Sequence, residues 1–294
     1  MKKLLYKYLK KIGFKIENIN KIRKKRIEYL NFFGVQKNSE LLIKSYDFIF
    51  NINNTFADLK IEDFNQGLLF SFDNNKIYVE TFEEILILNE IFVLNQYKHY
   101  IKHKLVLIDI GANIGVASIF FSKFKNIEKI YAYEPVEITY NQALLNFKLN
   151  KSCEKVEIKN YGLANSERKD IFDFNKNVKG NTGIRGNLSS SYAKELIKKV
   201  EVSLLSASDE IIKISQKHQN VKIFVKLDCE GGEYEIFENL VKSKCINEID
   251  YFILEWHDKG SDIIEKLLRD NGFFFFSQNL SVNTGLIHAY RNEC

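Results

Sequence analysis

The sequence lacks the cysteine spacing of disulfide-rich or zinc-binding proteins and the long apolar runs of membrane-spanning proteins. Its 294 residues include one proline, Pro135, and four cysteines, Cys153, Cys229, Cys245 and Cys294. The cysteines form no CxxC pair, so their spacing predicts neither a zinc site nor a disulfide framework, and we expect a protein of the reducing cytoplasm. No apolar run reaches the roughly eighteen residues of a membrane span. The N-terminus "MKKLLYKYLKK" also lacks the continuous apolar core of a signal peptide.

Positive charge is concentrated in one short segment. Residues 1–26 carry 11 of the 43 basic residues and one of the 38 acidic residues, which leaves 32 basic and 37 acidic residues in the rest of the chain. Apolar side chains recur at helical spacing in residues 1–45, starting with Leu4, Leu5 and Tyr8. A basic amphipathic helix can lie on an anionic membrane, touch nucleic acid or pack on its own domain. Peripheral contact with the inner face of the membrane is therefore one alternative for a cytoplasmic protein.

The order of the expected elements predicts an α/β fold. Residues 1–75 indicate a basic extension of helices and short strands, and residues 76–294 indicate the main domain. In that domain apolar strands such as "KLVLIDIG" and "KIYAYEP" alternate with helices, which is typical of a mostly parallel sheet with helices on both faces. The strands "FFFFSQN" and "GLIHAYRN" predict an antiparallel pair at one edge. The polar stretch 166–200 predicts a long loop, either a lid over the ligand or a loop without contacts.

A glycine-containing turn after the strand "VLIDI" indicates a ligand site. Asp109, Gly111 and Gly115 give the pattern DxGxxxG, which is neither the GxGxxG of dinucleotide-binding proteins nor a P-loop. An acid directly before the first glycine suits a ligand that carries an amino group. Glu134, at the end of the next strand, can accept both hydroxyls of a ribose. A nucleoside without phosphates and with a cationic group, namely S-adenosylmethionine, fits both features.

These residues and several others resemble the FkbM family of S-adenosylmethionine-dependent methyltransferases. The shared pieces occur in order as "NEIF", "DIGANIG", "YEP", "NYGLANSE", "GNTG", "VKLDCEGGEYEIF" and "ILEWH". The resemblance covers about residues 80–280 and implies a class I, Rossmann-like fold and methyl transfer to oxygen in most cases. The residues then expected to contact the cofactor are Glu90, Asp109, Gly111, Asn113, Gly115, Glu134, Pro135, Tyr161, Gly162 and Asp228.

Acidic and basic side chains follow the last two parallel strands and predict the acceptor side. "KLDCEGGE" places Lys226, Asp228 and Glu230 at one strand end, and "EWH" places Glu255 and His257 at the next. We expect His257 to take the proton of the acceptor hydroxyl, with Asp228 or Glu230 as the next candidates. Lys226 and Glu255 are predicted to bind the acceptor, or else to pair in a structural salt bridge. As a less favoured alternative, the acids hold a divalent metal that orients a diol.

The expected reaction is methylation of a sugar hydroxyl. Members of the family modify sugars, polyketides or precursors of secreted polymers, so the resemblance implies a nucleotide-sugar or surface-glycan precursor as acceptor, as in capsule or lipopolysaccharide biosynthesis. Asn181 and Arg185 of the polar stretch are expected to contact it, with Arg185 on the phosphates of a nucleotide-sugar. The alternative is a nucleic acid or another non-sugar acceptor, but the acidic strand ends repel phosphate backbones.

Overall fold

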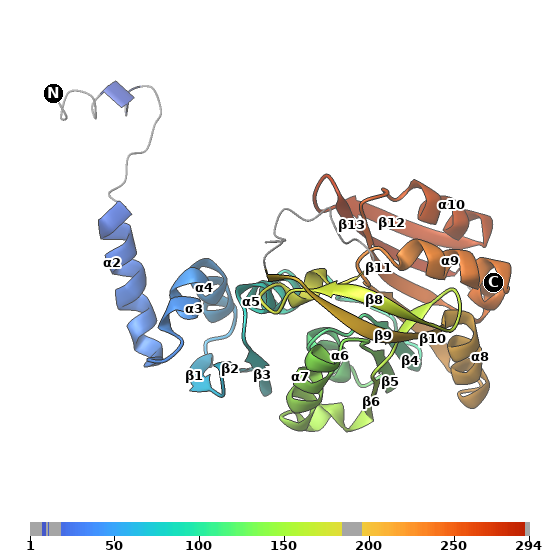
Figure 1. Ribbon diagram of the computed structural model, residues 1–294, viewed down its shortest axis with the longest axis horizontal. Coiled ribbons are helices and arrows are strands. Elements are labelled where there is room, and N and C mark those ends of the chain that lie inside the picture. Colours follow the sequence, from blue (N-terminus) through green and yellow to red (C-terminus); the bar gives the residue numbers. More distant parts are fainter. Residues whose placement is uncertain (1–7, 10, 12–18, 184–195, 292–294) are drawn as a thin grey trace.

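A seven-stranded sheet forms the centre of the protein (Figure 1). The computed structural model describes residues 8, 9, 11, 19–183 and 196–291. In spatial order the strands are β12 (Phe273–Asn279), β13 (Thr284–Arg291), β11 (Tyr251–His257), β10 (Lys222–Leu227), β4 (Leu105–Ile110), β5 (Ile127–Tyr133) and β6 (Val156–Lys159). The strands from β11 to β6 are parallel, and β13 runs antiparallel to both of its neighbours. This confirms the predicted α/β fold with an antiparallel pair at one edge.

Helices cover both faces of this sheet, and alternate strand residues face each cover. In β4, Leu105 and Leu107 belong to one buried cluster, whereas Val106 and Ile108 belong to another. The first cluster includes α6, and the second includes α8, α9 and α10. The bounds of the helices after β4 are α6 (Val116–Ser122), α7 (Glu137–Lys148), η3 (Lys151–Lys155), η4 (Lys179–Asn181), α8 (Ala207–Lys217), α9 (Glu233–Lys242), η6 (Cys245–Glu248) and α10 (Asp262–Asp270). Burial on both sides explains why "LVLIDI" is an uninterrupted apolar run except for its one acid.

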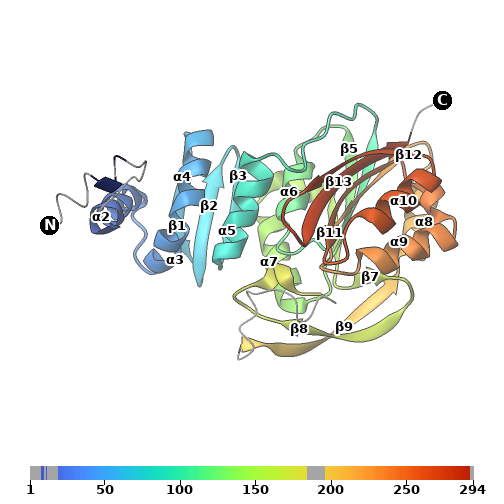
Figure 2. The same ribbon diagram turned by 90° about the horizontal axis from the view of Figure 1, so that it is seen from above.

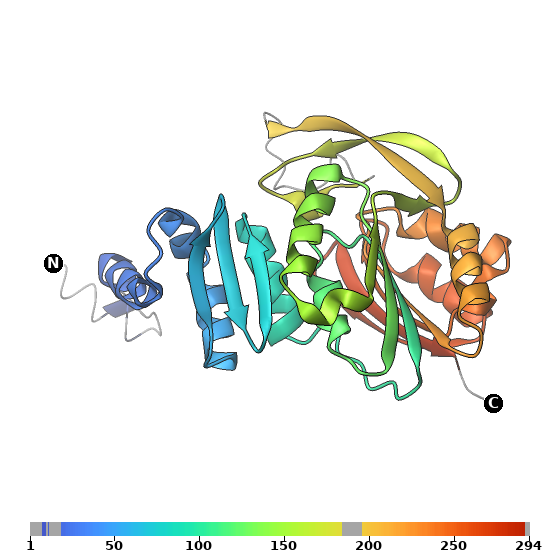
Figure 3. The same cartoon turned by 90° about the horizontal axis from the view of Figure 1, so that it is seen from below.

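A second sheet includes both ends of the stretch that was predicted to be a loop. It consists of β7 (Gly162–Ala164), β8 (Arg168–Phe174) and β9 (Lys198–Ser206), with β9 in the middle. Figures 2 and 3 show β8 and β9 as a long ribbon outside the central sheet. The loop prediction for residues 166–200 is therefore wrong at both ends. The sequence signal of strand β8 was the alternation of Phe172 and Phe174 with charged residues. Both phenylalanines are buried against β9.

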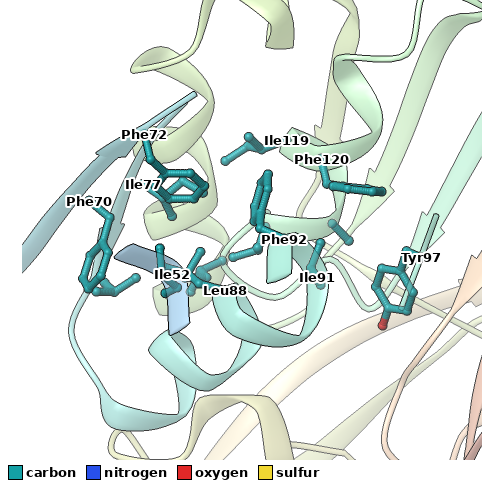
Figure 4. Close-up of a cluster of buried hydrophobic side chains, with 14 of the residues drawn as sticks. Ile52, Phe70, Phe72, Ile77, Leu88, Ile91, Phe92, Tyr97, Ile119 and Phe120 are labelled. Carbon is teal, nitrogen blue, oxygen red and sulfur yellow. The ribbon is translucent and has the colours of Figure 1, made fainter. Parts of the chain in front are cut away.

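The N-terminal part of the chain shares a hydrophobic core with the main sheet. Its elements are α2 (Ile19–Leu30), η1 (Asn31–Phe33), α3 (Ser39–Lys44), α4 (Tyr46–Thr55), β1 (Lys60–Phe64), β2 (Gly67–Phe72) and β3 (Asn75–Val79). The ring of Phe72 lies 5.1 Å from that of Phe92, which in turn lies 5.5 Å from Phe120 of α6 (Figure 4). The division of the chain after residue 75 stays a prediction, and this core continues across it.

Helix α2 lies at the far end of the molecule from β12 and α10 (Figure 1). Its lysines, such as Lys24 and Lys25, are exposed. Among the helices that the structure describes, none combines the length and the apolar composition that a membrane crossing requires. Most of the predicted amphipathic helix before residue 19 lies outside the described residues, so its membrane contact stays a prediction.

Two short helices connect the N-terminal part to the central sheet and bring acids towards its ligand edge. Helix α5 (Phe82–Leu88) begins at a capping box, in which Thr81 and Glu84 satisfy each other's backbone N–H groups. It continues into a π-helical turn, η2 (Asn89–Val93), which contains Glu90. Such π-turns are rare and are often found at functional sites.

Candidate active site

A cavity of about 260 Å³ lies at the carboxyl ends of β4, β5, β10 and β11. Strands β5 and β10 lie on opposite sides of β4, and in doubly wound sheets ligands bind at such a switch point of the strand order. Residues from both predicted groups line the cavity. Those predicted to contact the cofactor are Glu90, Gly111, Asn113, Glu134, Pro135, Gly162 and Asp228. Those predicted for the acceptor side are Lys226, Glu230, Glu255 and His257.

The two glycines of the turn are required by neighbouring protein segments. Gly111 has a φ of 77°, and a Cβ at that position would lie 1.7 Å from the carbonyl oxygen of Asp228. Gly115 has a φ of 88°, and its Cβ would lie 2.6 Å from the ring of Phe147 on α7. The turn thus brings the ends of β4 and β10 together, and it seats α6 against α7. Asn113, with a φ of 50°, also adopts the left-handed conformation and lines the cavity.

Glu134 is held by the backbone at the end of β5. Its Oε2 accepts a hydrogen bond from the N–H of Asn113 at 2.9 Å, and its Oε1 accepts one from the N–H of Val136 at 2.9 Å. Burial raises the pKa of Glu134 to about 7, although these hydrogen bonds act to lower it. Each carboxylate oxygen keeps a second lone pair, so the group can still accept the two hydroxyls of a ribose.

Among the described residues, three that were predicted to contact the cofactor do not line the cavity. Asp109 is fully buried beneath it, where its Oδ2 accepts a hydrogen bond from Ser118 at 2.6 Å and its Oδ1 lies 3.2 Å from Lys226 Nζ. Gly115 packs against α7, and Tyr161 is exposed beside the cavity. Arg185 and the side chain of Asn181, both predicted to bind the acceptor, lie outside the described residues.

Lys226 connects the turn to the acceptor side of the cavity. It is 3% exposed, its Nζ donates to the carbonyl oxygen of Gly111 at 2.8 Å, and it lies 3.7 Å from Asp228. Burial alone would lower its pKa, but the charges of Asp109 and Asp228 raise it above the usual value. Its close ion-pair partner is Asp109, whereas the sequence suggested Glu255 for a structural pair. The ammonium group of Lys226 is therefore bound to buried groups at the bottom of the cavity, namely the Gly111 carbonyl and Asp109.

His257 lies at the end of β11 among four carboxylates. Its Nδ1 lies 2.9 Å from Glu233 Oε1. Its Nε2 lies 3.6 Å from Glu255, 3.7 Å from Glu230 and 3.9 Å from Asp228. Burial on its own would lower the pKa of His257, but the hydrogen bond to Glu233 and the neighbouring Glu255 raise it to about 11. An imidazolium cannot accept a proton at neutral pH. The role of His257 as the base stays a prediction, which this raised pKa does not favour.

Three acids at the site, Glu233, Glu83 and Glu235, escaped the sequence interpretation. Glu233, at the first position of α9, is fully buried and orients His257. Glu83, in the first turn of α5, lines the cavity and accepts a hydrogen bond from the N–H of Gly180 at 2.9 Å. The spacing of "EGGE" placed Glu233 near Glu230, which was a usable signal. No local pattern indicated Glu83, because the same residue types occur in the first turn of ordinary capped helices.

Residues 109–275 match the family model of the methyltransferase FkbM domain, which is more than half of the chain. The chain belongs to the FkbM methyltransferase family. Its parallel sheet with an inserted antiparallel strand is the class I, Rossmann-like fold that this family implies. The protein is accordingly an S-adenosylmethionine-dependent methyltransferase.

This FkbM protein shares a low sequence identity with the two curated proteins and the one solved structure that follow. It is 25% identical over 189 residues to methyltransferase sdnD of Sordaria araneosa, covering 57% of this chain and 73% of that protein. It is 22% identical over 202 residues to AMB antimetabolite synthetase AmbE of Pseudomonas aeruginosa, covering 57% of this chain and 9% of that protein. A protein of the NADB-Rossmann superfamily from Streptococcus agalactiae is 16% identical with a TM-score of 0.37, covering 66% of this chain and 65% of that chain. That structural likeness adds nothing to the family match.

We expect the replacement of Glu134 by glutamine to weaken the binding of S-adenosylmethionine by about 1–3 kcal/mol, because a charged acceptor of the ribose hydroxyls is lost. In the wild-type protein, affinity should also fall below pH 7, since protonation of Glu134, with a pKa of about 7, removes that acceptor. The fall should approach about tenfold per pH unit and be absent in Glu134→Gln. Calorimetric titration measures both effects.

Glu137→Gln is the matched control for this prediction. Glu137 is exposed in the first turn of α7, three residues from Glu134, and it does not line the cavity that the described residues form. We expect its affinity and pH dependence to equal those of the wild type. Unchanged affinity in Glu134→Gln would remove Glu134 from the cofactor site.

Proposed function

We propose that the protein transfers a methyl group to a hydroxyl of a sugar, most simply an uncharged sugar unit of a surface-glycan precursor. The observation that carries this proposal is the row of carboxylates at the acceptor end of the cavity. Asp228, Glu230 and Glu255 meet there at two neighbouring strand ends, beyond the turn expected to hold the cofactor. Carboxylate oxygens accept hydrogen bonds from several hydroxyls at once, which suits a polyol.

The charge of the cavity favours a neutral acceptor over a phosphorylated one. Its described lining contains seven carboxylates, Glu83, Glu90, Glu134, Asp228, Glu230, Glu235 and Glu255. Its two lysines are both paired with buried acids: Lys179 lies 3.0 Å from Glu84, and Lys226 lies 3.2 Å from Asp109. A nucleic-acid backbone would be repelled by this lining. The phosphates of a nucleotide-sugar would need a cation such as Arg185, outside the described residues.

The proposed reaction needs a base, and we propose Glu90 of η2, which lines the cavity. S-adenosylmethionine supplies an electrophilic methyl group when it is bound. With Glu134 holding its ribose, the cofactor would offer that methyl group to the acceptor oxygen, and the hydroxyl proton would pass to a carboxylate of the cavity. Burial and the charges of Glu255 and Asp228 raise the pKa of Glu90 to about 7. A base with a pKa near the working pH is the most effective.

The test is incubation with methyl-labelled S-adenosylmethionine and three acceptor classes: neutral oligosaccharides, nucleotide-sugars and RNA. We expect mass spectrometry to show the gain of one methyl group, bound to oxygen, on a neutral saccharide. Label transfer to RNA alone would overturn the proposal in favour of a nucleic-acid acceptor. Transfer to nucleotide-sugars alone would retain sugar methylation but contradict the neutral acceptor.

A further inference from the structure

The imidazole of His257 faces three carboxylates that it does not reach with a hydrogen bond. The side chain is 2% exposed, and the distances from Nε2 to Glu255, Glu230 and Asp228 run from 3.6 to 3.9 Å. An N–H···O hydrogen bond is typically about 2.7–3.2 Å long. Nε2 therefore faces three carboxylate oxygens without forming a hydrogen bond to any of them.

The opposite side of the ring is fixed. Nδ1 lies 2.9 Å from Glu233 Oε1, and Glu233 also accepts hydrogen bonds from the N–H groups of Cys229 at 3.1 Å and of Gly231 at 2.9 Å. A carboxylate that accepts a hydrogen bond from the Nδ1–H of a histidine sets the tautomer and leaves Nε2 to face a ligand. This arrangement is found around most histidines that bind metals.

We propose that His257 Nε2, Asp228, Glu230 and Glu255 bind one divalent cation, with Glu233 as the orienting acid. The cation would displace the proton that the surrounding carboxylates hold on Nε2. Ligand atoms bound at about 2.1–2.3 Å lie about 3.0–3.7 Å from one another around the ion, so small movements of these side chains would complete the site. One ligand atom each of Asp228 and His257, two of the proposed ligands, lies within 4.8 Å of the other and of an oxygen of Glu233, the orienting acid. Glu230 is directed into the site from a left-handed backbone conformation, with a φ of 50°.

The ligand set indicates which ion binds and what it does. Three carboxylates with one imidazole favour Mn²⁺ or Mg²⁺ over Zn²⁺, which prefers nitrogen and sulfur ligands. The role of the ion rests on the proposed methylation of a sugar: it would bind the acceptor hydroxyl and lower the pKa of that hydroxyl. The hydroxyl proton would still pass to Glu90.

The experiment measures the binding of Mn²⁺ alone, without cofactor or acceptor. Full-length protein is treated with chelator, dialysed and titrated with Mn²⁺, and electron paramagnetic resonance follows the free ion. We expect about one ion per chain, and at least tenfold weaker binding by His257→Gln and by Glu255→Gln, the usual effect of damage to a metal site. Thermal unfolding shows whether each variant is folded. If His257→Gln is not folded, the nearly isosteric Glu255→Gln variant carries the test.

Glu235→Gln is the matched control. Glu235 lines the same cavity but lies 2.9 Å from Arg168, so its loss removes an equal charge without removing a ligand. Its Mn²⁺ affinity should stay within about twofold of wild type. No binding by the wild type, or equal binding by wild type and Glu255→Gln, would overturn the proposal. Sugar methylation that persists in chelator, together with no Mn²⁺ binding, would reject the metal and leave the proposed function standing.

Discussion

Replacing Glu90 by glutamine is expected to lower kcat by about 10²–10⁴-fold, the usual contribution of a positioned base. The affinity for S-adenosylmethionine should remain close to that of the wild type. Glutamine keeps the size of the side chain but cannot take the proton from the acceptor hydroxyl. The wild-type rate should rise with pH through about 7, because Glu90, with a pKa of about 7, must be ionised to act as base. Initial rates and calorimetric titration of the two proteins check these expectations.

This experiment also separates two roles of Glu90. The sequence resemblance implied a contact with the cofactor, whereas the proposed reaction assigns Glu90 the proton of the acceptor, because it lines the cavity and the charges of Glu255 and Asp228 raise its pKa. A variant that loses cofactor affinity and turns over normally at saturation would restore the cofactor role. A variant with wild-type kcat and wild-type affinity would exclude Glu90 from both.

Replacing Lys226 by methionine is expected to destabilise the protein by about 3–5 kcal/mol. The ammonium lies 3.2 Å from Asp109, which is fully buried and otherwise accepts a hydrogen bond from Ser118. Without Lys226, a carboxylate would remain in the core without its counter-charge. Methionine retains most of the volume, so the loss reports mainly on charge. Urea-induced unfolding gives the free energy of unfolding.

Lys222→Met provides the control on the same strand. Lys222 lies 2.9 Å from Asp250, and its side chain is 40% exposed. Exposed pairs contribute about 0–1 kcal/mol, so this variant should lose no more than that. If Lys226→Met lowered the free energy of unfolding as little as Lys222→Met does, the buried ion pair with Asp109 would not stabilise the bottom of the cavity.

The fold could be predicted because its signals are local. β4 is apolar on both faces, Gly111 and Gly115 follow it, and helices separate the strands, so a parallel sheet with a turn at its carboxyl edge was expected. Glu134 and His257 were placed correctly at that edge for the same reason. The ribbon of β8 and β9 was missed because its polar residues face solvent and its apolar residues, such as Phe172, are few.

The roles within the site could not be predicted, because they depend on contacts between distant residues. Asp109 looked like a ligand for an amino group, but Lys226 and Ser118 occupy it within the core. His257 looked like a base, but contacts with Glu233, 24 residues away, and with Glu255 raise its pKa. A short motif does not encode how deeply a side chain is buried or which charges from distant parts of the chain lie near it.

The most direct test of the account is a calorimetric titration of the wild-type protein with S-adenosylmethionine, with its demethylated product and with NAD. The DxGxxxG turn and Glu134 predict one site per chain for the first two ligands and no binding of NAD. Binding of NAD without binding of S-adenosylmethionine would contradict the assignment of the cavity, and with it the proposed methyl transfer.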